Sequence, residues 1–184
     1  DLDLVPIIDK IILDCPNIEK LVILCSKADL PSTKFSEVIS YEELLSMGSE
    51  NFEWIKGDET DACGICYTSG TTGNPKGVVY THRSNTLHAL TQAAPDMLNL
   101  SSTDTIMPVV PLFHANGWSI AYTAPLVGSS IVFPGGDLSP SSLYDMLERG
   151  VTITAAVPTV WLLLLNFLES EKKELSSLKR VVIG

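Results

Sequence analysis

The sequence YTSGTTGNPKG, residues 67–77, lies between two short apolar runs and has the composition of a loop that binds phosphate. Its glycines let backbone N–H groups approach an anion, its hydroxyl groups add donors, and Lys76 supplies a compact positive charge. A Walker A motif does not fit, because Lys76 precedes Gly77 instead of following the second glycine, and residues 78–80 are strand-like where Walker A begins a helix. A solvated turn rich in Ser, Thr and Gly is the alternative, but it leaves the position of the lysine unexplained.

Strand-like and helical segments alternate on both sides of this loop. The predicted strands are residues 63–67, 78–80, 105–110, 130–133, 151–156 and 180–183. The predicted helices are residues 85–98, 117–126, 141–149 and 159–169. Such alternation is typical of βαβ units. We therefore predict an α/β fold with a mostly parallel sheet flanked by helices.

The first 61 residues differ in character from the rest of the chain. They hold 14 acidic and 5 basic side chains, whereas residues 62–184 hold 8 acidic and 7 basic ones. Apolar spacing predicts one amphipathic helix at residues 4–12, a strand at 21–25 and a short helix near 41–47. We predict an acidic, irregular lead-in segment over residues 1–61 and a core domain over residues 62–184.

Composition excludes several classes of protein. The net charge of −10 disfavours nucleic acid as a partner, because neutralising phosphates needs a basic surface. The most apolar run, residues 155–168, includes Pro158 and is shorter than the roughly 20 residues of a membrane-spanning helix, so a buried core helix is predicted. No signal peptide is visible at the first residues, and four cysteines are too few for a disulfide scaffold. We expect a cytoplasmic protein without an integral membrane segment, and peripheral membrane association stays open.

The loop and its surroundings resemble a known family. YTSGTTGNPKG followed by VVYTHRS resembles the phosphate-loop signature of the adenylate-forming superfamily, which includes acyl-CoA synthetases. PVVPLFHANGW, residues 108–118, resembles the second core motif in the form found in medium- and long-chain fatty-acyl-CoA synthetases. Residues 156–159 and 181–184 also match in order and spacing. The resemblance covers at least residues 62–184 and implies the N-terminal domain of such an enzyme.

The resemblance implies a two-step ligase. A carboxylic acid reacts with ATP to give an acyl-adenylate and pyrophosphate, and coenzyme A then displaces AMP. Lys76 would act as a catalytic group on the phosphates, and Thr68 would contribute to the Mg²⁺ site. The resemblance assigns the remaining loop residues to ATP binding: Ser69, Gly70, Thr71, Thr72 and Gly73.

The second motif and the last strand supply the other implied site residues. His114 would orient the reacting carboxylate as a second catalytic group, and Ala115 would lie beside the adenylate. Trp118 would be a gate between the nucleotide site and an acyl tunnel. Gly184 follows a predicted strand at the place where α/β sheets present ligand-binding turns.

Several alternatives stay open. The later motifs of the superfamily, with a Mg²⁺-binding Glu and a C-terminal Lys, have no counterpart in this sequence, so we expect a piece of a larger enzyme that is inactive alone. The whole protein could form a homodimer. Its acid could be aryl, short-chain or sulfur-containing, or the protein could be a nucleotide-binding relative without catalysis.

Other chemistry-bearing residues fit structural roles better. Cys63 and Cys66 have the spacing of a redox or zinc pair but lack further ligands, and on one strand a spacing of three places them on opposite faces. We predict that both pack in the core. Trp161 and the leucines at 162–165 could line an acyl tunnel, but a core helix is the simpler prediction.

Overall fold

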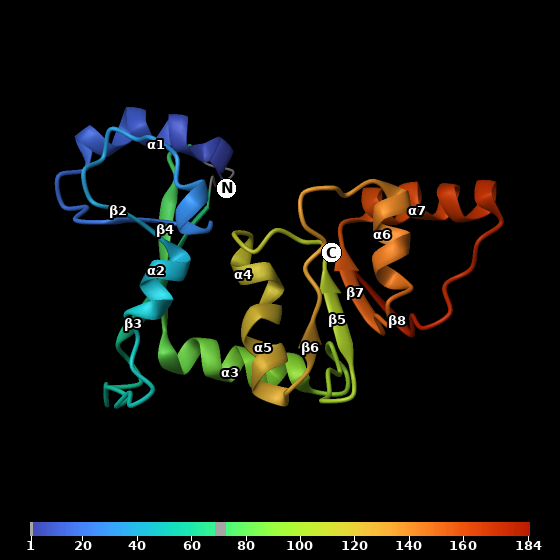
Figure 1. Ribbon diagram of the computed structural model, residues 1–184. Helices are drawn as coiled ribbons and strands as arrows, with labels where there is room; N and C mark the ends of the chain where they lie inside the picture. Colours follow the sequence, from blue (N-terminus) through green and yellow to red (C-terminus); the bar gives the residue numbers. More distant parts are fainter. Residues whose placement is uncertain (1, 69–72) are drawn as a thin grey trace. The chain divides into compact units, whose positions relative to one another are not determined.

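The computed structural model describes residues 2–68 and 73–184 (Figure 1). The chain divides between Lys56 and Gly57 into two compact units. The first unit contains a short parallel pair of strands, β1 (Leu21–Ile23) and β2 (Val38–Ser40). Its helices are η1 (Leu2–Leu4), α1 (Val5–Ile11), η2 (Ile12–Asp14), η3 (Lys27–Asp29) and α2 (Tyr41–Ser46). The predicted helices and first strand are present, whereas β2 is a strand that the sequence pattern did not predict.

The second unit begins with a β-hairpin that carries the predicted phosphate loop. Strands β3 (Ala62–Thr68) and β4 (Lys76–Thr81) pair antiparallel, with Thr68 opposite Lys76. A connection this short permits only an antiparallel pair, because a parallel pair needs a crossover of a dozen or more residues. Helix α3 (His82–Ala93) follows directly and starts earlier than the predicted residue 85.

A four-stranded parallel sheet forms the rest of this unit. The strand order is β6 (Ser130–Ile131), β5 (Thr105–Pro108), β7 (Ile153–Ala156) and β8 (Arg180–Ile183). Each neighbouring pair is parallel. The helices between these strands are α4 (Ala115–Trp118), α5 (Ile120–Val127), α6 (Pro140–Leu147) and α7 (Pro158–Glu171). The predicted α/β fold with a mostly parallel sheet is confirmed.

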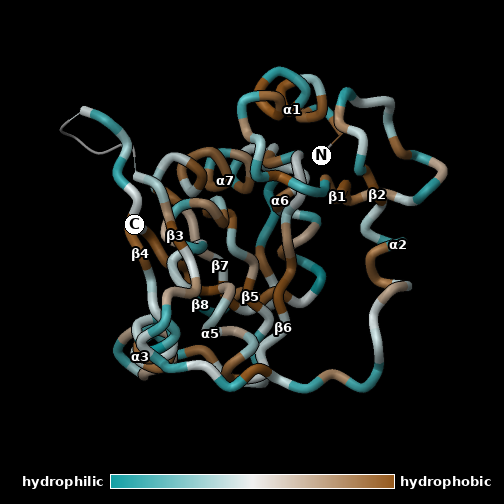
Figure 2. The backbone as a smooth tube through the Cα atoms, turned by 90° about the vertical axis from the view of Figure 1, so that its left-hand side faces the viewer, coloured by the Kyte–Doolittle hydropathy of each residue, from teal (hydrophilic) through white to brown (hydrophobic). Residues whose placement is uncertain are grey.

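Apolar side chains cover this sheet on both faces. Ile106 and Met107 are adjacent on β5 and fully buried in two different clusters, because successive residues of a strand point to opposite faces. The Ile106 cluster includes Ile120 and Ala124 of α5, and the Met107 cluster includes residues of α6 and α7. Figures 1 and 2 show α5 on one side of the strands and α6 with α7 on the other.

Helix α7 is less buried than predicted. Trp161 and Leu164 are in the core, and the indole Nε1 of Trp161 donates to the carbonyl of Ala156 at 3.2 Å. Three neighbouring side chains are more than half exposed: Leu162 at 61%, Leu163 at 59% and Leu165 at 54%. The prediction of a simple core helix was therefore wrong for these leucines, because only one face of α7 packs against described residues. Nowhere in residues 2–68 and 73–184 is a helix long and apolar enough to cross a membrane.

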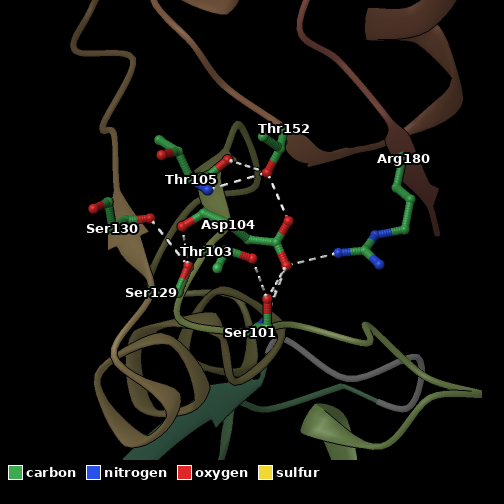
Figure 3. Close-up of polar contacts among 8 residues, drawn as sticks. All are labelled: Ser101, Thr103, Asp104, Thr105, Ser129, Ser130, Thr152 and Arg180. Atoms are coloured by element: carbon green, nitrogen blue, oxygen red, sulfur yellow. Dashed lines mark hydrogen bonds and ion pairs between the residues drawn. The ribbon is translucent and has the colours of Figure 1, made fainter.

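A buried carboxylate ties together the amino ends of the strands (Figure 3). Asp104, 7% exposed, precedes β5 and accepts hydrogen bonds from Ser101 and from Thr152 Oγ1. Its Oδ2 also forms an ion pair with Arg180 Nη2 at 2.9 Å. The backbone carbonyl of Asp104 accepts bonds from Ser129 Oγ and Ser130 N. One residue thus links β5, β6, β7 and β8 at the end of the sheet opposite the predicted site.

The surroundings of Asp104 favour its ionised form. Burial by itself would raise the pKa of this carboxyl group. The hydrogen bonds from Thr152 and Ser101 and the charge of Arg180 act against burial and hold the pKa below its ordinary value. Asp104 is therefore a structural anion and not a proton donor.

Candidate functional site

A cavity of about 490 Å³ lies between the β3–β4 hairpin and the segment that leads into α4. Its lining includes three of the predicted site residues, Thr68, His114 and Ala115. The other lining residues are Cys66, Tyr67, Val78, Tyr80 and Phe113. The structure therefore brings the edge of the phosphate loop and the second motif to one cavity, although they are far apart in sequence.

The hairpin fixes the two ends of the predicted phosphate loop. Thr68 is the last residue of β3, and Lys76, the first residue of β4, is its partner in the register. Gly73 has a φ of 117°, which is readily accessible only to glycine. Ser69, Gly70, Thr71 and Thr72 lie outside the described residues, so their roles stay predictions. Thr68, at the start of the loop, therefore lines the cavity, and Lys76 is paired with it across the hairpin.

Residues 115–119 form an unusual left-handed turn. Their φ angles are 44° at Ala115, 55° at Asn116, 60° at Gly117, 55° at Trp118 and 65° at Ser119. This turn comprises α4 (Ala115–Trp118) and ends at Ser119, and α5 begins only at Ile120, so the single helix predicted over residues 117–126 was wrong at its start. Left-handed conformations are unfavourable for residues other than glycine and cluster at functional sites. The turn lies directly after His114, where the resemblance places the reacting groups.

Hydrogen bonds hold this turn in place. The amide of Gly117 donates to the carbonyl of His114 at 3.0 Å, and the amide of His114 donates to the carbonyl of Pro111 at 3.0 Å. The thiol of Cys66 donates to Oδ1 of Asn116 at 3.4 Å. The last bond connects the turn to β3, so the two walls of the cavity are linked by a side-chain contact.

Trp118 and Gly184 meet each other near this turn. A Cβ placed on Gly184 would lie 2.8 Å from Cη2 of Trp118, so the indole ring packs directly against the glycine backbone. Gly184 follows β8, and the carboxyl ends of parallel strands are where α/β sheets bind ligands. Neither residue lines the 490 Å³ cavity. Trp118, which follows the His114 segment in sequence, is therefore packed against the end of β8 outside that cavity.

The charge around the cavity suits an anion. No acidic side chain occurs among the described residues that line it, and Lys76 stands at the first position of the adjoining strand. Residues 2–68 and 73–184 contain no group of three or more His, Cys, Asp or Glu side chains that could hold a metal ion. A cation at this site would therefore depend on hydroxyl groups and on oxygen atoms of a bound ligand.

Some lining residues were not predicted, and one prediction failed. Val78 and Tyr80 alternate on β4 and line the same cavity, so strand alternation could have identified them once the loop was recognised. Cys63 is exposed, and its Sγ accepts a hydrogen bond from Nδ2 of Asn85 at 3.1 Å. Core packing was therefore wrong for Cys63, because the face of β3 that carries it is open to solvent. It was also wrong for Cys66, which is half-buried, belongs to neither core cluster and lines the cavity.

Comparisons with known proteins agree with this arrangement. Residues 9–184 match the family of AMP-binding enzymes. The chain is 44% identical to the medium-chain-fatty-acid–CoA ligase of Ectopseudomonas oleovorans, over 97% of this chain and 33% of that protein. It is 38% identical to the 3-methylmercaptopropionyl-CoA ligase of Ruegeria pomeroyi, over 100% of this chain and 34% of that protein.

A solved structure shows the same fold. The chain superposes on a long-chain-fatty-acid-CoA ligase (FadD1) from Archaeoglobus fulgidus with a TM-score of 0.72 and 30% identity. The match covers 95% of this chain and 37% of that structure. The chain thus spans about a third of the length of the curated relatives that it matches.

Proposed function

Because the chain belongs to the family of AMP-binding enzymes, we propose that the whole protein containing it is an ATP-dependent acid–CoA ligase. Its acid is a medium- or long-chain fatty acid, by similarity to the relatives of that activity. The reaction converts the acid first to acyl-AMP and then to acyl-CoA. The observation that supports this most directly is the shared cavity, which Thr68 of the phosphate loop lines together with His114 and Ala115 of the second motif.

In the first step a carboxylate oxygen of the acid attacks the α-phosphorus of ATP. The bond from that phosphorus to the bridging oxygen breaks, and pyrophosphate leaves with the electron pair. Both reactants are anions, so the protein must align them and offset their repulsion. Lys76 supplies positive charge at the loop, and the loop glycines allow backbone N–H groups to approach the phosphates. No acidic side chain occurs among the described residues that line the cavity, so the lining adds no negative charge that would repel these two anions.

Mg²⁺ fits this site as a partner of the phosphates. Thr68 offers a hydroxyl oxygen, the ligand type that a hard cation prefers, and phosphate oxygens and water would complete its coordination. The ion would supply charge neutralisation on the phosphates when bound. Thr68 is the only residue of this chain that we assign to it.

The second motif holds the acid. We assign His114 to orienting the carboxylate by hydrogen bonding, and Ala115 to the wall beside the adenylate. In the second step the sulfur of coenzyme A attacks the carbonyl carbon of the acyl-adenylate, and AMP leaves. Trp118, packed on Gly184, is assigned to the boundary between the nucleotide and the acyl chain.

The proposal is tested by acid-dependent exchange of pyrophosphate into ATP in the whole protein. Lys76→Ala should lower the exchange rate by about 100-fold or more, the usual effect of removing a group that stabilises transition-state charge. Lys179→Ala removes an exposed lysine beside β8 and is the matched control. Unchanged exchange and ATP affinity in Lys76→Ala would show that the loop does not have this role.

Acid profiling decides the substrate class. A preference for octanoate or palmitate supports the fatty-acid assignment, and a preference for benzoate contradicts it. A preference for 3-methylthiopropionate would instead favour the sulfur-containing acid activated by the Ruegeria relative. A cytoplasmic location and a homodimer of the whole protein are also proposals, which cell fractionation and light scattering test.

A further inference from the structure

A small cavity of about 40 Å³ adjoins the candidate site. It shares Tyr80 and Ala115 with the larger cavity, so the two spaces are neighbours. Side chains with hydrogen-bonding groups make up the rest of its lining: Asn85, His88, Asn116, Ser119 and Tyr122. These residues come from α3 and from the left-handed turn and helix that follow His114.

Ser119 is the residue that singles out this cavity. It is 2% exposed, and no described residue provides a hydrogen-bond partner for its Oγ. Its backbone carbonyl, by contrast, accepts a bond from Thr123 Oγ1 at 3.0 Å. A buried hydroxyl group without a partner is unfavourable, and native proteins rarely keep one unless water or a ligand satisfies it.

Other lining residues have hydrogen-bonding capacity of both kinds. The amide nitrogen of Gln92 donates to Nε2 of His88 at 3.1 Å, so the neutral imidazole carries its proton on Nδ1. Asn116 uses Oδ1 as an acceptor for Cys66, and its amide nitrogen is the group that it can offer as a donor. Asn85 uses Nδ2 as a donor to Cys63, and its Oδ1 is the group that can accept. Donors and acceptors together suit an oxygen atom that both gives and receives hydrogen bonds.

The size of the cavity limits what can occupy it. A space of about 40 Å³ can hold one or two groups of the size of water and is too small for an alkyl chain. We infer that this cavity is a polar subsite for one hydrogen-bonding oxygen, held by Ser119 next to the reacting end of the acid. The oxygen belongs either to a hydroxyl substituent near the carboxyl group or to a water molecule that an unsubstituted acid leaves in place. The first source, a hydroxyl group of the acid, rests on the proposed function, whereas a bound water molecule does not.

Substrate comparison in the whole protein tests the first source. The probes are octanoate, 3-hydroxyoctanoate and 8-hydroxyoctanoate, and the readout is kcat/KM for pyrophosphate release. Ser119→Gly is the main variant, because the φ of 65° at this position suits glycine and the change should not disturb folding. Thr123→Val is the backbone control: it removes the hydroxyl group that donates to the Ser119 carbonyl but does not line the cavity, so it separates loss of the Ser119 hydroxyl from loss of support for its backbone.

If a substituent occupies the subsite, Ser119→Gly should lower the ratio of kcat/KM for 3-hydroxyoctanoate to that for octanoate by about 5- to 10-fold, as expected for one lost hydrogen bond. The same ratio for 8-hydroxyoctanoate should not change, because its hydroxyl group is far from the carboxyl end. Thr123→Val should leave both ratios as in the wild type.

A crystal structure of the wild-type protein tests the second source. An ordered water within hydrogen-bonding distance of Ser119 Oγ, together with unchanged substrate ratios in Ser119→Gly, assigns the oxygen to water. Unchanged ratios and an empty space beside Ser119 Oγ would overturn the subsite. If no acid supports pyrophosphate exchange in the wild type, the proposed function fails, and the crystal structure alone still decides whether the cavity binds an oxygen.

Discussion

Gly184 and Trp118 are packed so closely that a Cβ at residue 184 would lie 2.8 Å from Cη2 of the indole and 3.0 Å from Cζ2. Carbon atoms that are not bonded to each other prefer separations of about 3.5–4.0 Å. The indole ring is partly buried and also packs against the core cluster that contains Ile120 and Ile153, so a shift of the ring would disturb that packing. The absence of a side chain at residue 184 is therefore what allows β8 to approach the left-handed turn.

Gly184→Ala should destabilise the whole protein by about 1–3 kcal/mol, the usual penalty for overpacking. Denaturant unfolding at pH 7 measures the loss. In the Trp118→Leu background Gly184→Ala should cost little further stability, because the smaller side chain leaves room for the methyl group. An equal loss from Gly184→Ala in the Trp118→Leu background would show that the indole contact is not the cause.

Gly117→Ala tests the left-handed turn after His114. Gly117 is buried with a φ of 60°, and a Cβ there would lie 2.9 Å from Cδ2 of Leu112. The end of a leucine side chain can shift, so backbone strain should dominate and lower stability by about 1–2 kcal/mol. Gly64→Ala is the control, since a Cβ there meets no heavy atom within 4 Å. Equal melting temperatures for the two variants would contradict a strained turn.

Thr81→Ala should weaken the start of α3. The hydroxyl of Thr81 accepts from the amide of Ser84 at 3.1 Å, and Oγ of Ser84 accepts from the amide of Thr81 at 2.9 Å. Loss of an N-cap side chain typically costs about 1 kcal/mol. Hydrogen exchange of the first amides of α3 should accelerate in Thr81→Ala and stay near the wild-type rate in Thr81→Ser, which keeps the acceptor. Faster exchange in both variants would mean that the cap is not responsible.

Much of the fold could be predicted from local sequence. Residues 180–183 were predicted as a strand and form β8 with the same bounds, because apolar strand-length runs between turn-forming residues carry a strong signal. Strand β2 was missed because it contains only two apolar residues, whereas β1 lies in an apolar run of five, residues 21–25. The direction of β4 relative to β3 follows from the length of the connection, which the alternation of elements does not take into account.

The sequence predicted some residues of the candidate site and missed others. The motif at residues 67–77 indicated Thr68, and the motif at 108–118 indicated His114 and Ala115, which line the same cavity. Spacing could not predict the left-handed turn at 115–119, since residues other than glycine adopt this conformation only when tertiary contacts impose it. Ser119 escaped notice for the same reason: nothing in a local pattern shows that its hydroxyl group is buried without a partner.

Asp104→Asn tests the polar cluster at the amino ends of the strands. At pH 7 the variant loses the ion pair to Arg180 and weakens the bonds from Ser101 and Thr152, so the protein should lose about 1–3 kcal/mol of stability.

Because the pKa of Asp104 is lower in the folded than in the unfolded protein, its carboxylate stabilises the fold at pH values above the unfolded pKa of about 4. That contribution is lost as the pH falls from this value through the folded pKa, since protonation then removes the charge that Arg180 pairs with. Urea unfolding between pH 7 and pH 3 should therefore show that the difference in unfolding free energy between wild type and Asp104→Asn narrows only at the acidic end. Asp145→Asn, an exposed site on α6, should show no comparable gap at any pH. If this difference in unfolding free energy stays constant down to pH 3, the packing of the Asp104 side chain and not its charge accounts for its role.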